Sequence, residues 1–280
     1  MISPQLVEEV LQKLGLLAPP EPDLAGLEDL YGRWCRKVPF DNIRKRLALS
    51  IGGGGPLPGY CAEDFFRAWL SYGTGGTCWA VSQGLYDLLA AVGFDVARAA
   101  CTMLSSPTVR GPNHGTVIAT INSRRYVVDG AMLTERPLPL QEGVLGGAEH
   151  PAAQVRVGKQ ARRWHVAWRP LHRPEGFSCR IEAIGLSGPA FDRYYEGTRG
   201  WSPFNYSVYA RTNTQDRITG VAFGQRVTLG PDGDAVSEAI GSGERNRFLV
   251  EHLGIAEEIV ARLPADESLP PPPGPPERSS

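Results

Sequence analysis

The sequence lacks the features that mark several broad classes of protein. No stretch of the 280 residues approaches the roughly 20 consecutive apolar residues that a helix needs to cross a membrane. The first residues show no basic segment followed by an apolar run of about 7–15 residues, so we expect no secretory signal. The formal net charge is only −1, which gives no general indication of binding to nucleic acid or to a membrane surface.

Cysteine is scarce, and its placement does not indicate a metal site. The cysteines are odd in number and scattered, with no metal-ligand spacing; they stand at positions 35, 61, 78, 101 and 179. We therefore expect a reduced cytoplasmic protein with one functional thiol and no bound metal. The tract Gly52–Gly55 lacks the lysine and the Ser or Thr of a phosphate-binding loop, which excludes that kind of nucleotide site.

The composition is that of a globular protein. Apolar residues make up 42% of the chain and charged residues 21%. The length allows one large domain or two small ones with a sizeable core.

The stretch Gly73–Trp79 predicts a flexible loop that runs into a helix. Apolar residues then recur at helical spacing along one face: Val81, Leu85, Leu88, Leu89 and Val92. Gly93 follows as a stop signal. Cys78 thus falls in the first turn, where unpaired backbone N–H groups and the helix dipole stabilise a thiolate. The alternative interpretation is a small buried cysteine that begins a core helix.

His114 and Asp129 flank a predicted β-hairpin. If Asn122 and Ser123 are the two central residues of its turn, Asp129 faces Thr116, and His114 is the diagonal neighbour of Asp129 on the same face. Diagonal neighbours lie roughly 7–8 Å apart at the backbone, within reach of an imidazole and a carboxylate. A three-residue turn would instead place the two side chains on opposite faces.

Four motifs resemble, in order and spacing, those of the arylamine N-acetyltransferases: Val38-Pro39-Phe40-Asp41-Asn42, Gly75-Gly76-Thr77-Cys78, His114, and Tyr126-Val127-Val128-Asp129. That family has a Pro-Phe-Glu-Asn element, an Arg-Gly-Gly-x-Cys motif, a histidine that opens a strand and an aspartate that closes one. The resemblance implies a catalytic triad of Cys78, His114 and Asp129, related to those of transglutaminases and papain-like proteases.

The sequence departs from the family pattern around these residues. Thr74 stands where the family has arginine, and Trp79-Ala80-Val81-Ser82 replaces Phe-Glu-x-Asn after the cysteine. After Asp129, Gly130-Ala131-Met132 replaces Val-Gly-Phe-Gly. The three triad residues are retained, whereas the pocket around them differs.

The fold that we expect is α+β, with the cysteine-protease-like core that the resemblance implies. The residue patterns suggest that the middle unit is a β-barrel or a curved sheet. The resemblance implies three units in order: a helical bundle domain with the nucleophile (1–93), a β-barrel domain with His and Asp (94–200) and an α/β lid (201–263). A disordered Pro-rich tail (264–280) follows. The patterns predict helices over 5–15, 24–37, 61–71 and 244–262, and strands over 94–103, 154–157, 164–168, 179–184, 206–212 and 221–229.

Three functions agree with these residues. The first is N-acyl transfer through a thioester on Cys78, as in acetyl-CoA:arylamine N-acetyltransferases, with His114 as base and Asp129 orienting it. The second is an amide synthase that releases a polyketide or peptidyl chain from a carrier protein. The third is a catalytically silent homologue that only binds a ligand or partner.

The resemblance also implies the partners and the substrate contacts. We expect a small-molecule amine and an acyl-CoA or acyl-carrier protein, no nucleic acid or membrane partner, and no permanently bound cofactor. Phe40 and Phe204 match aromatic positions that line the substrate cleft in the family, with core packing as the alternative, and Trp79 is the third predicted substrate-binding residue.

Charge is unevenly distributed along the second half of the chain. Residues 151–180 hold seven Arg or Lys against one acid, and residues 231–280 hold ten acids against four bases. Both stretches are interpreted as solvated faces. The alternative is that the basic stretch meets the phosphates of coenzyme A or the acidic face of a carrier protein.

Overall fold

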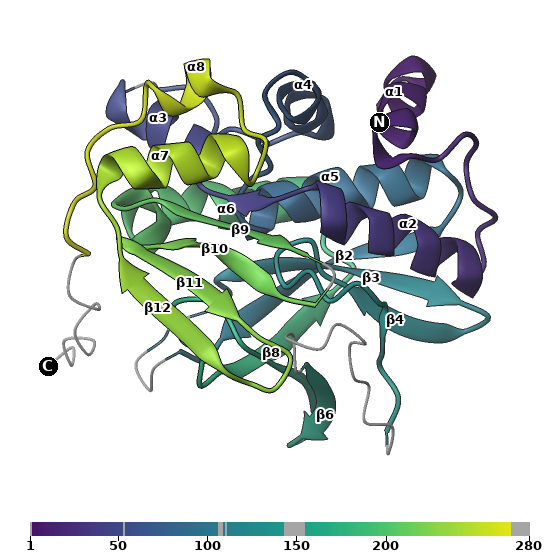
Figure 1. Cartoon of the computed structure of the whole chain (residues 1–280). Coiled ribbons are helices and arrows are strands. Elements are labelled where there is room, and N and C mark those ends of the chain that lie inside the picture. Colours follow the sequence, from purple (N-terminus) through teal and green to yellow (C-terminus); the bar gives the residue numbers. More distant parts are fainter. Residues whose placement is uncertain are drawn as a thin grey trace, which may run out of the picture.

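The computed structural model describes residues 2–52, 54–105, 109, 111–142, 155–214 and 216–269. In Figure 1 most helices form a layer on one side of the β-strands. The described residues form eight α-helices: α1 (Pro4–Leu14), α2 (Leu24–Lys37), α3 (Ile43–Ser50), α4 (Ala62–Tyr72), α5 (Cys78–Ala91), α6 (Gly188–Gly197), α7 (Ser242–Glu251) and α8 (Glu257–Val260). Two short 3₁₀ turns, η1 (Thr198–Gly200) and η2 (Pro203–Asn205), follow α6.

The larger of two antiparallel sheets has seven strands in the order β5-β4-β3-β2-β8-β7-β6. Its strands are β2 (Asp95–Met103), β3 (His114–Ile121), β4 (Arg124–Val128), β5 (Leu138–Pro139), β6 (Arg156–Gln160), β7 (Arg163–Trp168) and β8 (Phe177–Ile184). Because each strand pairs with its neighbours in antiparallel fashion, short hairpins can connect β3 to β4 and β6 to β7.

The smaller sheet has the order β1-β9-β10-β11-β12. It consists of β1 (Phe40–Asp41), β9 (Tyr209–Asn213), β10 (Ile218–Ala222), β11 (Gln225–Leu229) and β12 (Ala235–Ala239). Strand β1 comes from the N-terminal part of the chain and pairs with β9. The sheet thus joins the segment that precedes α3 to the C-terminal third of the protein.

Helix α5 lies against β2 and β3 of the larger sheet. Every residue from Cys78 to Leu85 is buried, so the start of the helix is covered on all sides rather than along one stripe. Gly115 in β3 permits this close approach, because a Cβ atom there would lie 2.6 Å from the Trp79 ring. The chain leaves the helix at Gly93, as predicted, in a left-handed conformation with φ of 97°.

The N-terminal helices match the sequence prediction closely. Helices predicted over 5–15 and 24–37 are confirmed as α1 and α2. Helix α2 begins at Asp23, whose carboxylate accepts a hydrogen bond of 2.8 Å from the Gly26 N–H. Their buried apolar faces join α4, α5 and the larger sheet in one continuous core.

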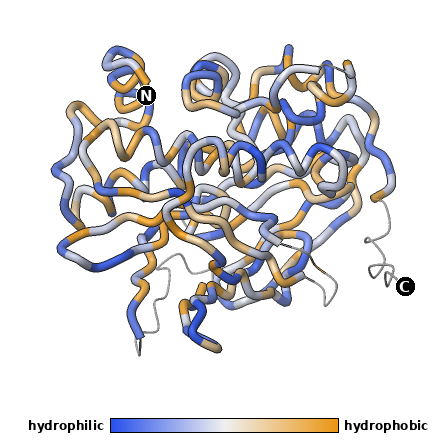
Figure 2. Tube along the Cα trace, turned by 180° about the vertical axis from the view of Figure 1, so that it is seen from behind, coloured by the Kyte–Doolittle hydropathy of each residue, from blue (hydrophilic) through white to orange (hydrophobic). Residues whose placement is uncertain are grey.

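A second, smaller core lies beneath α7 and α8, where their buried side chains meet β9, β10 and Ile43 of α3. Figure 2 shows hydrophobic residues running through the middle of the helices and strands, whereas the β6–β7 hairpin at the lower edge is largely hydrophilic. Within the described residues, no helix is both long enough and apolar enough to cross a membrane.

The predicted α+β fold, with a barrel-like sheet beneath helices, is confirmed. Two element predictions are wrong. The strand predicted over 221–229 is a hairpin, since Phe223 and Gly224 turn the chain with φ of 52° and 83° between β10 and β11. The helix predicted over 244–262 is two helices, because the chain breaks at Gly254, which has φ of 68°.

The start of the predicted disordered tail is also wrong. Residues 264–269 lie against the protein: Asp266 forms ion pairs with Arg46 and Arg245, and the Glu267 N–H donates to the Tyr206 carbonyl at 2.8 Å. Residues 270–280 lie outside the described residues. The division of the chain into a helical domain, a barrel domain and a lid stays a prediction.

Candidate active site

Cys78 is the first residue of α5, as the sequence predicts. The preceding residue, Thr77, is extended and its side chain does not cap the helix. The first N–H groups of the helix are therefore not satisfied by the cap, and they and the helix dipole favour a negative charge on the sulfur. The residue is 7% exposed.

The loop before Cys78 is held by Asp41 of β1. The Asp41 carboxylate accepts a hydrogen bond of 2.6 Å from the Gly75 N–H, and the Asp41 N–H donates to the Gly76 carbonyl at 3.2 Å. A Cβ atom on Gly75 would lie 1.8 Å from the Pro39 carbonyl oxygen. Glycine is therefore required here by the neighbouring backbone. Burial raises the pKa of Asp41 to about 6, against hydrogen bonds that favour its charged form.

His114 and Asp129 meet across the β3–β4 hairpin. The register pairs Val117 with Val128, and Asn122 and Ser123 form the turn with φ of 48° and 65°. This is the register that the sequence prediction assumed. His114 Nε2 lies 2.7 Å from Asp129 Oδ2, and both side chains are almost completely buried.

The imidazole of His114 also interacts with Cys78, and the negative charge of the sulfur raises the pKa of His114. The Cys78 thiol itself lies 4.0 Å from the Asn113 carbonyl oxygen, next to His114 in the chain. Because Nε2 contacts Asp129, Nδ1 is the nitrogen left for the sulfur. The other carboxylate oxygen of Asp129 accepts hydrogen bonds from the N–H groups of Ala131 and Met132 at 2.9 and 2.8 Å. The three predicted triad residues are thus brought together in the order Cys, His, Asp.

The electrostatics of this group favour a charged imidazole. Burial opposes the charged form of His114, but the negative charges of Asp129 and Cys78 and its hydrogen bonds to both raise its pKa well above the usual value. Burial likewise opposes the charged form of Asp129, yet the interaction with His114 and the Met132 N–H lowers its pKa. The arrangement is one in which a thiolate and an imidazolium can coexist.

Tyr31 of α2 supports this group and was not predicted from the sequence. Its hydroxyl donates to the Asp129 carbonyl at 2.8 Å and accepts from the Asp129 N–H at 3.0 Å. It also lies 2.9 Å from the Thr134 hydroxyl. The buried hydroxyl fixes the backbone on both sides of the Asp129 side chain. In the sequence Tyr31 has only the helical spacing of a core residue.

The three predicted substrate-binding residues lie in two aromatic groups. The rings of Phe40 and Phe204 lie 5.5 Å apart, and Tyr209 lies 5.5 and 5.3 Å from them. Trp79 belongs to another group, with Phe191 at 4.8 Å and the exposed ring of Tyr194 stacked at 5.5 Å. Phe40 and Trp79 are buried, whereas Phe204 is half-buried.

Lys45 of α3 is a buried cation near Cys78 that sequence reasoning missed. Its Nζ donates to the Thr198 hydroxyl at 2.8 Å, and none of the ion pairs between described residues includes it. Burial lowers the pKa of Lys45 to about 7, which the negative charge of Cys78 partly opposes. The sequence around Lys45 has no feature that distinguishes it from an exposed lysine.

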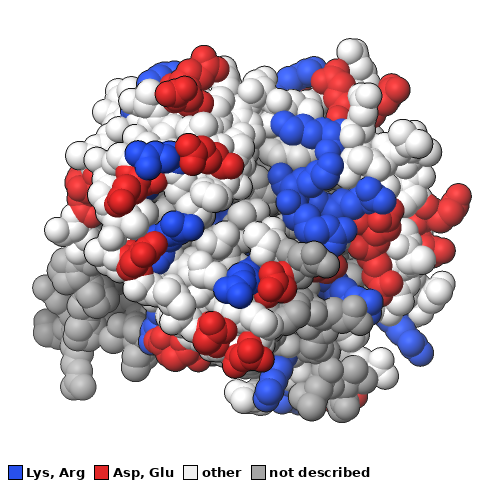
Figure 3. All heavy atoms as spheres, viewed as in Figure 1, with Lys and Arg blue, Asp and Glu red and all other residues white. Residues whose placement is uncertain are grey.

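Some of the charges elsewhere are paired. In Figure 3 Lys and Arg gather on one part of this face beside Asp and Glu, and elsewhere the two signs are interspersed. Within the basic stretch 151–180, Arg163 and Arg180 both form ion pairs of 2.7 Å with Glu182, and Arg173 pairs with Glu175 at 3.0 Å. Part of its charge is therefore neutralised by the protein itself.

Comparison with known proteins places this geometry in a family. The model of the family described as N-acetyltransferase matches residues 23–169. The arylamine N-acetyltransferase of Mycolicibacterium smegmatis is 25% identical over 175 residues, which are 58% of this chain and 62% of that protein. The match thus spans less than two thirds of the relative's length.

Solved structures share the fold. The arylamine N-acetyltransferase of Mycobacterium marinum superposes with a TM-score of 0.79 at 17% identity, covering 92% of this chain and 96% of that chain. The same enzyme in complex with CoA gives 0.76 at 17% identity, covering 92% and 98%. At this identity the likeness shows the fold, and it agrees with the predicted fold class. Because the family model covers more than half of the chain, this protein belongs to the N-acetyltransferase family of enzymes.

Proposed function

We propose that this protein transfers an acetyl group from acetyl-CoA to the nitrogen of an arylamine, through a thioester on Cys78. The observation that carries the proposal is the contact of His114 with Asp129 at 2.7 Å, together with the interaction of His114 with Cys78 at the start of α5. Family membership supports acyl transfer, and the related proteins named arylamine N-acetyltransferase support the choice of acceptor. The relative solved with CoA supports the choice of donor.

In the first half of the reaction, the Cys78 thiolate attacks the carbonyl carbon of acetyl-CoA. The bond between that carbon and the CoA sulfur breaks, and the leaving thiolate takes the proton from the His114 imidazolium. Asp129 fixes the imidazole so that Nδ1 faces the sulfur, and it stabilises the charged ring before the proton leaves.

In the second half, the amine nitrogen attacks the thioester carbonyl. Neutral His114 accepts the proton that the amine loses, and the Cys78 sulfur leaves as a thiolate, which restores the starting pair. In each half the carbonyl oxygen becomes negatively charged. The Cys78 backbone N–H is suited to stabilise that charge, because it is the first N–H group of α5 and has no acceptor within the helix.

The aromatic residues suggest where the acceptor ring binds. Phe204 is half-buried and packs against Phe40, whose neighbour Asp41 holds the loop before Cys78. We propose that an aryl ring contacts Phe204, and that Phe40 and Trp79 act mainly by packing, since both are buried.

All five cysteines are free thiols, which fits a reducing compartment such as the cytoplasm.

Intact-mass spectrometry tests the proposal. Acetyl-CoA alone should add one acetyl group to the protein, on Cys78, and an arylamine such as aniline should remove it as the N-acetyl product. Cys78→Ala should gain no acetyl group, and Cys61→Ala, which removes the half-buried cysteine at the start of α4, should behave like the wild type. Initial rates should follow ping-pong kinetics. Absence of acetylation from acetyl-CoA would overturn the proposal.

A further inference from the structure

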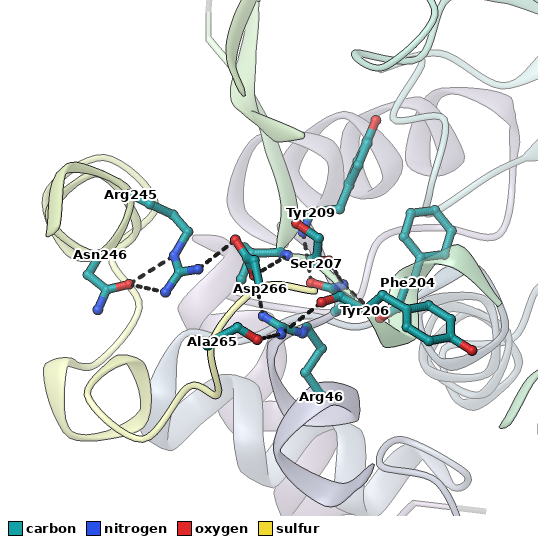
Figure 4. A network of polar contacts seen from close by, with 11 residues as sticks. Arg46, Phe204, Tyr206, Ser207, Tyr209, Arg245, Asn246, Ala265 and Asp266 are labelled. Carbon is teal, nitrogen blue, oxygen red and sulfur yellow. Dashed lines mark hydrogen bonds and ion pairs between the residues drawn. The ribbon is translucent and has the colours of Figure 1, made fainter. Parts of the chain in front are cut away.

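Asp266 lies in the segment that follows α8 and links three separate parts of the chain. Its Oδ1 accepts from Arg46 of α3 at 2.6 Å and from the Val208 N–H at 3.0 Å. Its Oδ2 accepts from Arg245 of α7 at 2.7 Å. Figure 4 shows the two guanidinium groups approaching the carboxylate from different helices. The term clamp is used below for Asp266, Arg46, Arg245 and Val208.

The two arginines of the clamp are buried, with side chains only 1% and 7% exposed. Asp266 is the carboxylate that forms ion pairs with both of them among the described residues. A buried guanidinium without a counter-charge costs several kcal/mol in general, so the clamp depends on this one carboxylate. These ion pairs therefore help to hold the segment in place.

A cavity beside the clamp supports this conclusion. It has a volume of about 470 Å³, and Arg245, Asp266 and the neighbouring residues of the 263–266 segment line it. Val221 and Ile240 also line it, so the segment is packed incompletely against apolar side chains on that side, although Leu263 packs against the smaller core. Hydrogen bonds add to the ion pairs: Arg46 donates to the Ala265 carbonyl at 2.6 Å, and the Glu267 N–H donates to the Tyr206 carbonyl at 2.8 Å.

The clamp faces the segment that carries Phe204. On the opposite side, Asn42 donates to the carbonyls of Phe204 and Ser207 at 2.8 and 2.7 Å and accepts from the Tyr209 N–H at 2.9 Å. Asn42 directly follows Asp41, which anchors the loop of Cys78. Residues 204–209 are therefore held both by Asn42 and by Asp266, and Figure 4 shows Asp266 with the two arginines that approach it.

We propose that Asp266 is a positioning residue that sets the place of the Phe204 ring, and through it the affinity for the aromatic acceptor. This inference rests on the proposed function. Without the carboxylate, the two arginines lose their shared partner and the Val208 N–H loses its acceptor. Residues 204–209 keep the contacts from Asn42, from the Glu267 N–H and from strand β10, but they lose their anchor on the C-terminal segment. The Phe204 ring is then held less firmly against Phe40. The triad lies outside the clamp and keeps its geometry.

The experiment compares Asp266→Asn with the wild type in the full chain, with aniline as acceptor. The KM for aniline should rise about 3–10-fold, because the binding surface for the aryl ring is displaced while the chemistry is unchanged. The rates of Cys78 alkylation by iodoacetamide and of Cys78 acetylation by acetyl-CoA should stay within about twofold. Asp266→Glu, which keeps the charge, should recover part of the lost affinity. Glu258→Gln, at an exposed carboxylate of α8, is the matched control and should leave every value unchanged.

A double-mutant cycle tests whether the effect passes through Phe204. Phe204→Leu should raise the KM for aniline, and adding Asp266→Asn to it should raise the KM little further, since both changes act on the same contact. Arg245→Gln removes one clamp arginine and serves as a second variant if Asp266→Asn does not fold. It should raise the KM in the same direction.

Three outcomes would overturn the inference. The first is a lower melting temperature with an unchanged KM, which would make Asp266 structural only. The second is a parallel loss of alkylation, acetylation and kcat, which would place its effect on the triad. The third is a wild-type protein that does not acetylate aniline at all, which refutes the proposed function and this inference with it. A wild type that is active while the variant keeps its KM refutes the inference alone.

Discussion

The His114 imidazole and the Asp129 carboxylate meet at 2.7 Å although they stand at the outer ends of a hairpin. His114 is the first residue of β3, and Asp129 directly follows the last residue of β4. The two-residue turn at Asn122-Ser123 sets the register that puts both side chains on one face. The relative position of the proposed base and its carboxylate partner is therefore determined by a local feature of the chain.

Replacing the carboxylate by an amide should show how much this contact contributes. In Asp129→Asn we expect kcat for acetyl transfer to fall by about 10³–10⁴-fold, because an amide cannot stabilise the imidazolium and can hold the wrong tautomer. Steady-state kinetics with acetyl-CoA and aniline measure the effect. Asp95→Asn, at an exposed position at the start of β2, is the control. A loss below about tenfold would show that Asp129 does not act on His114 during the reaction.

Cys78 should be the most reactive of the five thiols. Burial raises the pKa of Cys35 to about 12 and that of Cys179 above its usual value, so both should remain thiols and react slowly. Cys61 is half-buried and stands at the N-cap position of α4. Brief iodoacetamide treatment at neutral pH followed by peptide mapping should label Cys78 at least about tenfold faster than Cys61. Equal labelling of the two would contradict the thiolate–imidazolium pair.

The glycine two positions before Thr77 should tolerate no side chain. In Gly75→Ala the new methyl carbon would lie 1.8 Å from the Pro39 carbonyl oxygen, so β1 and the loop must separate. We expect a loss of more than about 2 kcal/mol in the free energy of unfolding. Thermal and urea denaturation measure it. Gly55→Ala is the control, since a Cβ atom there meets nothing within 4 Å. Equal stability of the two variants would show that the loop can move away at little cost.

Local sequence patterns were sufficient for the parts of the site that local geometry determines. The start of α5 at Cys78 follows from glycines before an apolar helix, and the facing of His114 and Asp129 follows from a two-residue turn. The helices α1 and α2 follow from the spacing of their apolar residues. In each of these cases the residues that decide the structure are close together in the chain.

The remaining features depend on partners far apart in the sequence. Tyr31 meets Asp129 across 98 residues, and Asp266 meets Arg46 across 220. No pattern within a helix or strand indicates such a contact. The Pro-rich composition after residue 264 therefore predicts a disordered tail. Asp266 lies in that stretch and nevertheless contacts Arg46. The β10–β11 turn was missed for another reason, since it places Phe223, a residue disfavoured at positive φ, at its first position.

Lys45 provides a prediction for stability as a function of pH. Burial lowers the pKa of Lys45 to about 7 in the folded protein, from 10.5 when the side chain is free, and the facing charges of Cys78, Glu196 and Arg199 modify this shift. A lowered lysine pKa means that the folded state binds fewer protons than the unfolded state between these two values, so stability rises with pH across that window. The cost of the buried charge is fully present below about pH 7 and is relieved toward about pH 10.5.

Lys45→Met should therefore raise the free energy of unfolding by about 1–3 kcal/mol at about pH 6, and the gain should shrink toward about pH 10. Urea denaturation across this range measures the difference. Lys159→Met, at a surface lysine of β6 whose ammonium group pairs with Glu142, is the control. A gain for Lys45→Met that stays constant from about pH 6 to 10 would show that Lys45 keeps its ordinary pKa in the folded protein.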